Sequence, residues 1–455
     1  MQIFLTLMYC ISSLLLFSTA TVFSEQPHHD VQQKKKWTVI IYVAADNNLR
    51  RFVTNNIKQM AEIGSNHSLN ICVELHTTVR SGKKVMHRYY IEKDKIVRIN
   101  AENQKSDAID SGNPHTVVSS CNYFIEHYPA DEYALILWNH GSGILDPFGG
   151  RSVNTMDLFT FNPITKKLDL DRSISFLDMI HDQESKHKGI CWDDTTGNYL
   201  TSQEIDDALH TIRTNSLNGQ KFSIIGFDAC FMQMAEVAHI IKKHADIMVG
   251  SQEVELAIGW DYKNALAGFL TSIPDKYQFA HDMVTSYGNY YKSIMNDYTL
   301  SALNLAVFET LECNIHEVAT LMVEGLKNQH ETSVTDLIKT SSSRRECTQF
   351  YEPTYIDLRH FYHNLRSNLT RTKLMPNHDE KKWKNALDTA LKEGCKLVQS
   401  VVFANVVGKS LHQACGISIY FPESSKRIHQ SYRKTEFATT NEWMNFLLQH
   451  QYTLA

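Results

Sequence analysis

Unbroken apolar runs that alternate with amphipathic segments constrain the fold of this chain most strongly. Strand-like runs cover 37–45, 69–76, 133–139 and 222–228, and helical periodicity fills segments such as 47–63. A strand that is buried on both faces has no polar side, so it reads as a continuous apolar run. Alternation of such strands with helices is typical of a mostly parallel sheet with helices on both faces. The expected fold class is therefore α/β.

Composition divides the chain into four parts. An apolar run with small residues near its end predicts a secretory signal peptide, and a polar, basic stretch after it predicts a linker or short pro-segment. The predicted parts are the signal peptide (1–24), the linker (25–36), a main α/β domain (37–297) and a C-terminal α/β subdomain (298–455). We therefore expect a secreted or periplasmic protein. No Lys or Arg precedes the apolar run, which leaves an uncleaved membrane anchor as the alternative.

Charge and cysteine content exclude several classes of protein. The formal net charge is −5, and no basic patch dominates, so nucleic acid is not an expected partner. Beyond Cys10 in the predicted signal peptide, eight cysteines are widely and irregularly spaced without CxxC pairs. This spacing indicates neither a zinc site nor a dense disulfide framework. Most of these cysteines are expected to be small buried side chains.

Reactive or acidic side chains follow three of the predicted strands. Asp46, His140 and Cys230 each come directly after the apolar run of a strand. Ligands of parallel α/β sheets bind at the carboxyl ends of the strands, so we expect these residues to share one edge. The residues after Asp228 predict an amphipathic helix with Cys230 at its N-terminus, a position that lowers the pKa of a thiol. A buried structural cysteine is the alternative.

Glycines surround the candidate base. His140 precedes Gly141-Ser142-Gly143, a turn in which the backbone can approach a substrate and offer amides to an oxyanion. An imidazole beside a thiol can act as a general base and then as a general acid. In this chain the His comes before the Cys. That order excludes a papain-like arrangement and fits a caspase-like one.

The chain resembles the clostripain family of cysteine peptidases, which belongs to the caspase-like clan. The resemblance rests on WTVIIYVAADNNL, ILWNHGSG, ICWDDTTGNYLT, IGFDACFMQMAEVA, GSQEVELAIGWDY and, more loosely, GISIYFPE, which together span 37–423. It implies a caspase-like fold over 37–297 and a cysteine endopeptidase with a His140–Cys230 dyad. It also implies that the amides of Gly141 and Cys230 bind the oxyanion. The alternative is a secreted, non-catalytic binding protein that retains this fold.

The resemblance also implies cleavage after Arg or Lys, hence protein or peptide substrates with a basic P1 residue. Asp228 matches the acidic residue of the family's S1 pocket, and a buried carboxylate there would select a cation over a neutral side chain. Asp46, Ser251 and Trp260 are further S1 candidates. The alternative role of both aspartates is to cap a helix.

One segment departs from the family pattern. Relatives commonly carry a Pro-Gly turn where this chain has Leu256-Ala257-Ile258, which puts the outline of the S1 pocket in question. Glu253 and Glu255 in the same segment are expected to be solvated, and the alternative is that they add negative charge to the pocket.

A long insertion separates the candidate His from the candidate Cys. Periodicity fails over 144–189, apart from a short helical piece at 173–182. Relatives are often made as zymogens and cut in this region, so the resemblance implies a two-chain form after self-cleavage. The insertion offers basic residues for such a cut at Arg151, Lys166, Lys167, Arg172, Lys186 and Lys188.

Asp193 and Asp194 raise the question of a metal cofactor. Some relatives depend on calcium, and these aspartates with the two threonines that follow could supply oxygen ligands. Their spacing lacks the DxDxDG pattern with a distal Glu. A structural turn is the favoured interpretation, and no cofactor is assigned.

Overall fold

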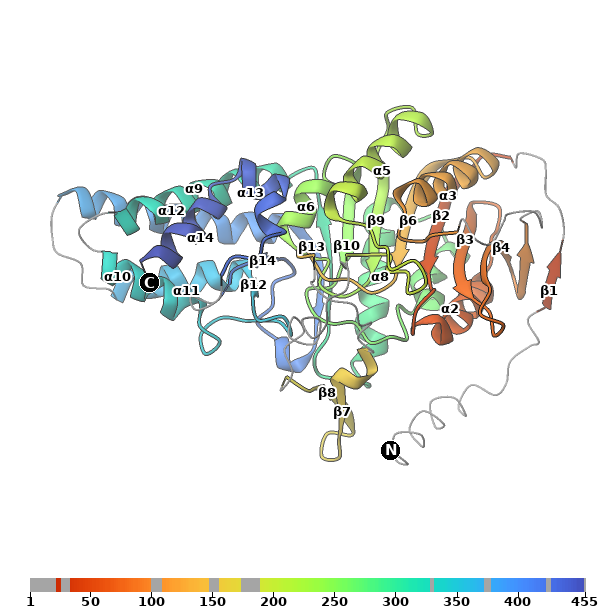
Figure 1. Ribbon diagram of the computed structural model, residues 1–455, viewed down its shortest axis with the longest axis horizontal. Coiled ribbons are helices and arrows are strands. Elements are labelled where there is room, and N and C mark those ends of the chain that lie inside the picture. The colour runs from red at the N-terminus through yellow and green to blue at the C-terminus, as the bar shows by residue number, and fades with distance from the viewer. Residues whose placement is uncertain are drawn as a thin grey trace.

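A ten-stranded sheet forms the centre of the molecule (Figure 1). The computed structural model describes residues 22–25, 33–99, 109–146, 155–172, 189–327, 331–371, 378–422 and 427–453. The strands, in spatial order, are β1 (Val22–Glu25), β5 (Lys95–Arg98), β4 (Lys84–Glu92), β3 (Leu69–Thr78), β2 (Lys35–Ala44), β6 (Ala130–Trp138), β9 (Phe222–Asp228), β10 (Ala245–Gly250), β11 (Thr299–Asn304) and β13 (Val402–Val407).

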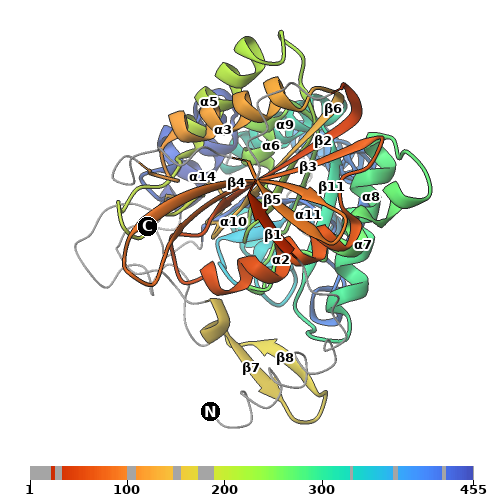
Figure 2. The same ribbon diagram turned by 90° about the vertical axis from the view of Figure 1, so that its right-hand side faces the viewer.

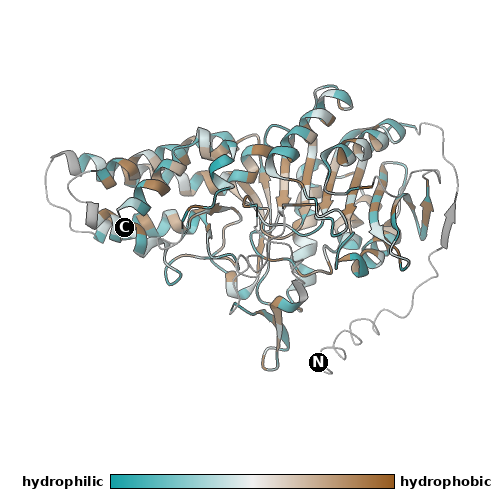
Figure 3. Ribbon diagram, in the orientation of Figure 1, coloured by the Kyte–Doolittle hydropathy of each residue, from teal (hydrophilic) through white to brown (hydrophobic). Residues whose placement is uncertain are grey.

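The middle of the sheet is parallel. Strands β3, β2, β6, β9 and β10 pair in parallel with one another, whereas β4 runs antiparallel to β3 and β11 runs antiparallel to β10. Every residue of β9 is buried, and Figure 3 colours the central strands as predominantly hydrophobic. This burial on both faces explains the unbroken apolar runs, and the predicted mostly parallel sheet is confirmed.

Helices cover both faces of the sheet (Figure 2). One face carries α3 (Pro114–His127), α5 (Ser202–Asn215) and α6 (Ala235–Ile241), and the other carries α2 (Arg50–Ile63), α7 (Tyr262–Leu266) and α8 (Lys276–Tyr291). Helix α5 begins with the predicted capping box, in which Thr201 and Glu204 satisfy each other's backbone amides. Short 3-10 turns lie at η3 (Ala267–Leu270), η4 (Lys409–Leu411) and η5 (Tyr432–Lys434).

The C-terminal part adds a helical layer and two strands of the central sheet. Its helices are α9 (Phe308–Lys327), α10 (Glu331–Ser342), α11 (Leu358–Arg371), α12 (His378–Val401), α13 (Glu436–Thr440) and α14 (Trp443–Tyr452). Strands β12 (Tyr355–Asp357) and β14 (Ser418–Tyr420) form a separate antiparallel pair. Because β11 and β13 extend the main sheet beside β10, the region from 298 onward is packed into the same core. The division at 297 stays a prediction.

A projecting hairpin belongs to the predicted insertion (Figure 1). It consists of η2 (Thr155–Leu158), β7 (Phe159–Asn162) and β8 (Lys167–Leu170). The helical piece predicted at 173–182 lies outside the described residues, as do residues 1–21 of the predicted signal peptide. Among the helices that the structure describes, none has the length and apolar character needed to cross a bilayer.

Candidate active site

The register of two parallel strands brings His140 and Cys230 to the same edge. Trp138 of β6 pairs with Asp228 of β9, so each candidate residue lies two positions beyond its strand. The backbone of Gly141 packs so closely against this turn that a Cβ at position 141 would lie 2.3 Å from the carbonyl oxygen of Cys230. Glycine is therefore required here, and the two strand ends that carry the predicted dyad are in contact.

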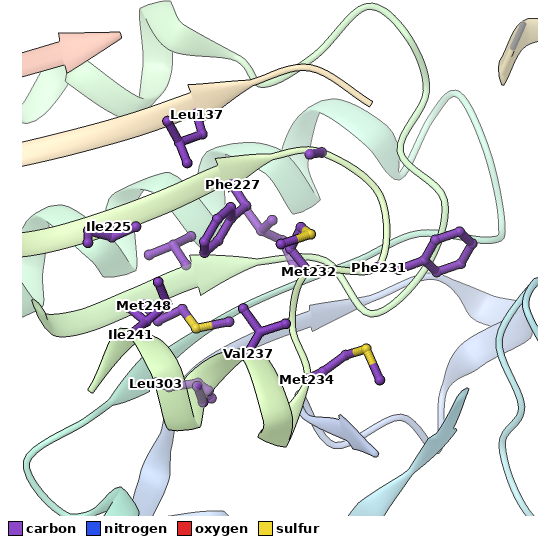
Figure 4. Close-up of a cluster of buried hydrophobic side chains, with 14 of the residues drawn as sticks. Leu137, Ile225, Phe227, Phe231, Met232, Met234, Val237, Ile241, Met248 and Leu303 are labelled. Carbon is purple, nitrogen blue, oxygen red and sulfur yellow. The ribbon is translucent and has the colours of Figure 1, made fainter. Parts of the chain in front are cut away.

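The predicted helix at Cys230 does not begin there. Helix α6 starts at Ala235, and the residues before it form a tight turn in which Phe231 has φ of +63°. In Figure 4, Phe231 points away from the apolar cluster that holds Met232. Its ring packs edge-on against Tyr355. The expectation that a helix N-terminus lowers the thiol pKa was wrong for this conformation.

Burial dominates the chemistry of the thiol instead. Cys230 is only 4% exposed, and desolvation raises the pKa of its thiol, because the charged form loses its hydration. The amide of Glu255 donates to the sulfur at 3.2 Å, which opposes this effect in part. In this conformation the thiol is protonated near neutral pH. A base is needed to generate the nucleophile.

A small pocket joins the dyad to the predicted specificity residue. Its walls come from both strand ends, from the start of α2 and from the loop after β10, and its volume of about 20 Å³ holds a single water molecule. The lining residues are Leu49, Trp138, Asn139, His140, Asp228, Ala229, Cys230, Glu255, Leu256, Ala257 and Gly259. The loop of Glu255 to Gly259 therefore fills much of the space beside the thiol.

Two buried carboxyl groups lie at the base of this pocket. Asp228 accepts hydrogen bonds from Tyr262 Oη at 2.7 Å and from the Trp260 amide at 3.2 Å, both at Oδ2. Burial raises the pKa of Asp228 to about 6. Burial, together with the nearby charge of Asp228, raises the pKa of Glu255 well above its usual range. As pH rises, Asp228 is thus the carboxyl group of the pair that ionises first.

Neither predicted aspartate caps a helix. Helix α6 is preceded by Met234, which makes no side-chain cap, so Asp228 is not its N-cap. Helix α2 is preceded by Leu49, also without a side-chain cap, so Asp46 is not an N-cap either. The helix-capping alternatives were therefore wrong for both residues.

Glu253 and Glu255 are buried, contrary to the expectation that they are solvated. The carboxylate of Glu253 accepts from Arg172 Nη2 at 2.8 Å and from the Tyr351 amide at 2.8 Å. Arg172 also lies 3.5 Å from Asp297. Arg172 of the insertion thus neutralises the carboxylate of Glu253. This ion pair ties the insertion to the segment that leads into the loop of Glu255 to Gly259.

Two further S1 candidates, Ser251 and Trp260, lie on either side of this loop and help to shape it. Ser251 Oγ donates to the carbonyl of Glu253 at 2.9 Å, and it does not line the pocket. Trp260 is buried, and its indole nitrogen donates to Glu255 Oε2 at 3.1 Å. Its ring packs over Gly226 of β9, where a Cβ would lie 3.0 Å from the ring. Through its amide and its indole nitrogen, Trp260 thereby holds Asp228 and Glu255 in place beside the pocket.

Asp46 points to a separate buried ion cluster. Its Oδ2 lies 3.3 Å from Lys84 Nζ, and the same ammonium group also binds Asp193 Oδ2. Asp193 additionally accepts from the amide and hydroxyl of Ser111. Among the described residues no group of three or more His, Cys, Asp or Glu side chains is arranged to hold a metal ion. Of the two carboxylates considered for calcium, Asp193 is thus engaged by an ammonium group and Asp194 accepts from the indole nitrogen of Trp192.

Sequence reasoning missed several residues of the pocket and one partner of the histidine. The pocket is also lined by Leu49, Trp138, Asn139 and Ala229, and only their closeness in sequence to the ends of β2, β6 and β9 could have indicated this. His140 Nε2 lies 2.7 Å from Asn48 Oδ1. Asn48 lies 92 residues before His140 in the sequence. A single asparagine forms no motif that would indicate this pairing.

The chain is similar to known proteins over most of its length. The model of the clostripain family matches residues 41–156 and 178–450. Clostripain of Hathewaya histolytica is 26% identical over 255 residues, which cover 50% of this chain and 41% of that protein. The match thus spans well under half of the length of that relative.

Solved structures share the fold. A secreted C11 cysteine protease from Bacteroides thetaiotaomicron, in complex with an irreversible peptide inhibitor, superposes with a TM-score of 0.57 at 17% identity, over 90% of this chain and 99% of that one. An inactive zymogen C11 protease from Parabacteroides distasonis gives a TM-score of 0.56 at 19% identity, with the same coverage. The caspase-like fold expected from the sequence is confirmed. Since the family model matches most of its length, the chain belongs to the clostripain family of cysteine proteases.

Proposed function

We propose that this protein is a secreted cysteine endopeptidase that hydrolyses peptide bonds after Arg or Lys through a His140–Cys230 dyad. The observation that carries the proposal is the shared pocket, in which His140, Cys230 and the buried carboxyl group of Asp228 line one space at the ends of β6 and β9. Family membership supports the reaction class.

The proposed reaction begins with transfer of the thiol proton from Cys230 to His140. The thiolate sulfur then attacks the scissile carbonyl carbon, and the oxyanion that forms is bound by the amides of Gly141 and Cys230. His140 gives its proton to the leaving amine as the C–N bond breaks, which leaves a thioester. Water, deprotonated by His140, hydrolyses the thioester and restores the thiol.

The proposed specificity rests on charge in a desolvated pocket. Asp228 is 5% exposed, and the described residues that line the pocket with it include no Lys or Arg. A P1 guanidinium or ammonium group would pair with the ionised carboxylate, whereas a neutral P1 side chain would leave that charge buried and unpaired. The loop of Glu255 to Gly259 must move to admit the long P1 side chain, because the pocket holds only one water molecule.

Hydrolysis of short reporter peptides tests this function. We expect wild-type protein to cleave peptides with Arg or Lys at P1 and to leave those with Asp or Ala intact, and we expect Cys230→Ala to cleave none. Cys313→Ala is the matched control, since Cys313 is an exposed thiol remote from the pocket lining. If Cys230→Ala keeps its turnover, the thiol mechanism is wrong. If wild type has none, the alternative of a non-catalytic binding protein gains support.

We also propose that self-cleavage in 144–189 activates the enzyme. The contact of Arg172 with Glu253 supports this, because a cut in the insertion would release the segment that holds the pocket-filling loop. Of the basic residues that the structure describes here, Lys166 is exposed in the hairpin turn, while Lys167 donates to the carbonyl of Lys292. Lys166 is therefore the favoured cut site among them; Arg151, Lys186 and Lys188 lie outside the described residues.

Mass spectrometry of purified protein checks this processing. We expect wild type to yield two associated chains whose junction follows a basic residue of the insertion, and Cys230→Ala to remain a single chain. A fully active wild type that stays intact would refute the activation step. The same spectra report whether residues 1–24 are removed, as the proposed secretory route requires.

A further inference from the structure

We propose that Asn48 is a positioning residue that fixes the ring orientation and tautomer of His140, and this inference rests on the proposed dyad. Asn48 Oδ1 lies 2.7 Å from His140 Nε2. A carbonyl oxygen accepts, so the ring donates from Nε2, and its lone pair is then on Nδ1. The other ring nitrogen is thereby kept ready to take the thiol proton.

The loop that carries Asn48 is held rigidly. Asn47 Nδ2 donates to the carbonyls of Ala44 and Trp192 at 3.0 Å each, and Asn47 Oδ1 accepts from the Leu49 amide at 2.9 Å. The Asp194 amide donates to the carbonyl of Asp46 at 2.8 Å. A partner held on both sides in this way can orient a catalytic ring without loss of entropy at each turnover.

The same scaffold also holds the backbone next to His140. Asn139 Oδ1 accepts from the Trp192 amide at 2.9 Å, and its Nδ2 contacts the carbonyls of Ala44 and Trp192. The histidine therefore lies where three segments meet, namely the end of β2, the end of β6 and the segment after the insertion. This gives the conspicuous sequence ICWDDTTG a role: its backbone braces the loops that present Asn48 and His140.

Paired substitutions test the inference by pH profile. Asn48→Ala removes the acceptor and is expected to lower kcat on an Arg reporter by roughly tenfold to a hundredfold, with little change in KM. Asn48→Asp keeps an acceptor and adds a charge that stabilises the protonated ring. We expect it to retain more activity than Asn48→Ala and to move the acidic limb of kcat/KM, below which the base His140 is protonated, to higher pH by about one unit. Asn55→Ala, at an exposed position of α2, is the control.

The outcomes separate this inference from the proposed function. If His140→Ala is inactive while Asn48→Ala matches wild type in kcat and pH profile, the positioning role is refuted and the dyad stands. If both Asn48 variants lose activity in parallel with thermal stability and neither shifts the profile, Asn48 is merely structural, which also refutes it. If His140→Ala is active, the dyad itself fails.

Discussion

Replacing His140 with alanine is expected to lower kcat/KM on an Arg reporter peptide by roughly 10³- to 10⁴-fold, the upper part of the range for loss of a general acid–base. The loss is large because burial raises the pKa of the Cys230 thiol, so little thiolate forms without a base. Helix α6 begins at Ala235, five residues after Cys230, so its N-terminus does not lie at the thiol. Rates of hydrolysis of the Arg reporter, measured from pH 5 to 10, give the size of this loss.

His115→Ala is the matched control, because His115 is exposed on α3. We expect the control to match wild type and the His140 variant to unfold at an unchanged temperature. If His140→Ala stays within tenfold of wild type at neutral pH, the thiol has another source of activation. If its activity recovers at high pH, as hydroxide deprotonates the thiol, the assignment of His140 as base is supported further.

Replacing Asp228 with asparagine is expected to remove the preference for basic P1 residues. The variant keeps an oxygen for Tyr262 and the Trp260 amide but loses the charge. Loss of one partner of a buried charge pair costs about 2–5 kcal/mol, so kcat/KM on Arg and Lys reporters should fall by roughly 30- to 5,000-fold. The Ala reporter, which wild type is expected to leave intact, gives the baseline against which this fall is measured.

The pH dependence gives a second readout for Asp228. Because its pKa is raised to about 6, the carboxylate that binds a cation is lost as pH falls through that value. We therefore expect kcat/KM for the Arg reporter to fall as pH drops through about 6, and this fall to be less steep in Asp228→Asn, in which only protonation of the base His140 remains. Glu255→Gln is the matched comparison, since it changes the neighbouring carboxyl group of the pocket and keeps an oxygen that can accept from Trp260. A larger loss in Glu255→Gln than in Asp228→Asn would transfer the specificity role to Glu255.

The sequence predicted the parts of the site that depend on strand ends. Apolar runs located β2, β6 and β9, and the shared edge of parallel strands then placed His140 beside Cys230. The helical pattern of the sequence gave a wrong prediction for the residues immediately after Cys230. The residues from Phe231 to Met234 have helical spacing, but Phe231 adopts a positive φ and Met234 is extended. Packing of this turn against β12 and β14 overrides the local periodicity.

Long-range partners decided the features that the sequence could not predict. Glu253 reads as a surface residue, yet Arg172, which is 81 residues earlier, allows it to be buried. Asp46 reads as a cap or a specificity residue, yet Lys84 draws it into an ion cluster with Asp193. Such pairings join residues that are far apart in the chain, so no spacing in the sequence predicts them.

Covalent labelling tests the central claim most directly. The protein is incubated with an irreversible, thiol-directed peptide inhibitor that carries Arg at P1, and the modified residue is located by mass spectrometry. The account predicts one adduct per chain, on Cys230, formed in step with loss of activity, absent in Cys230→Ala and slowed in His140→Ala. Iodoacetamide should modify the exposed Cys313 in all these variants. An adduct on another cysteine, or full inactivation with Cys230 unmodified, would contradict the account.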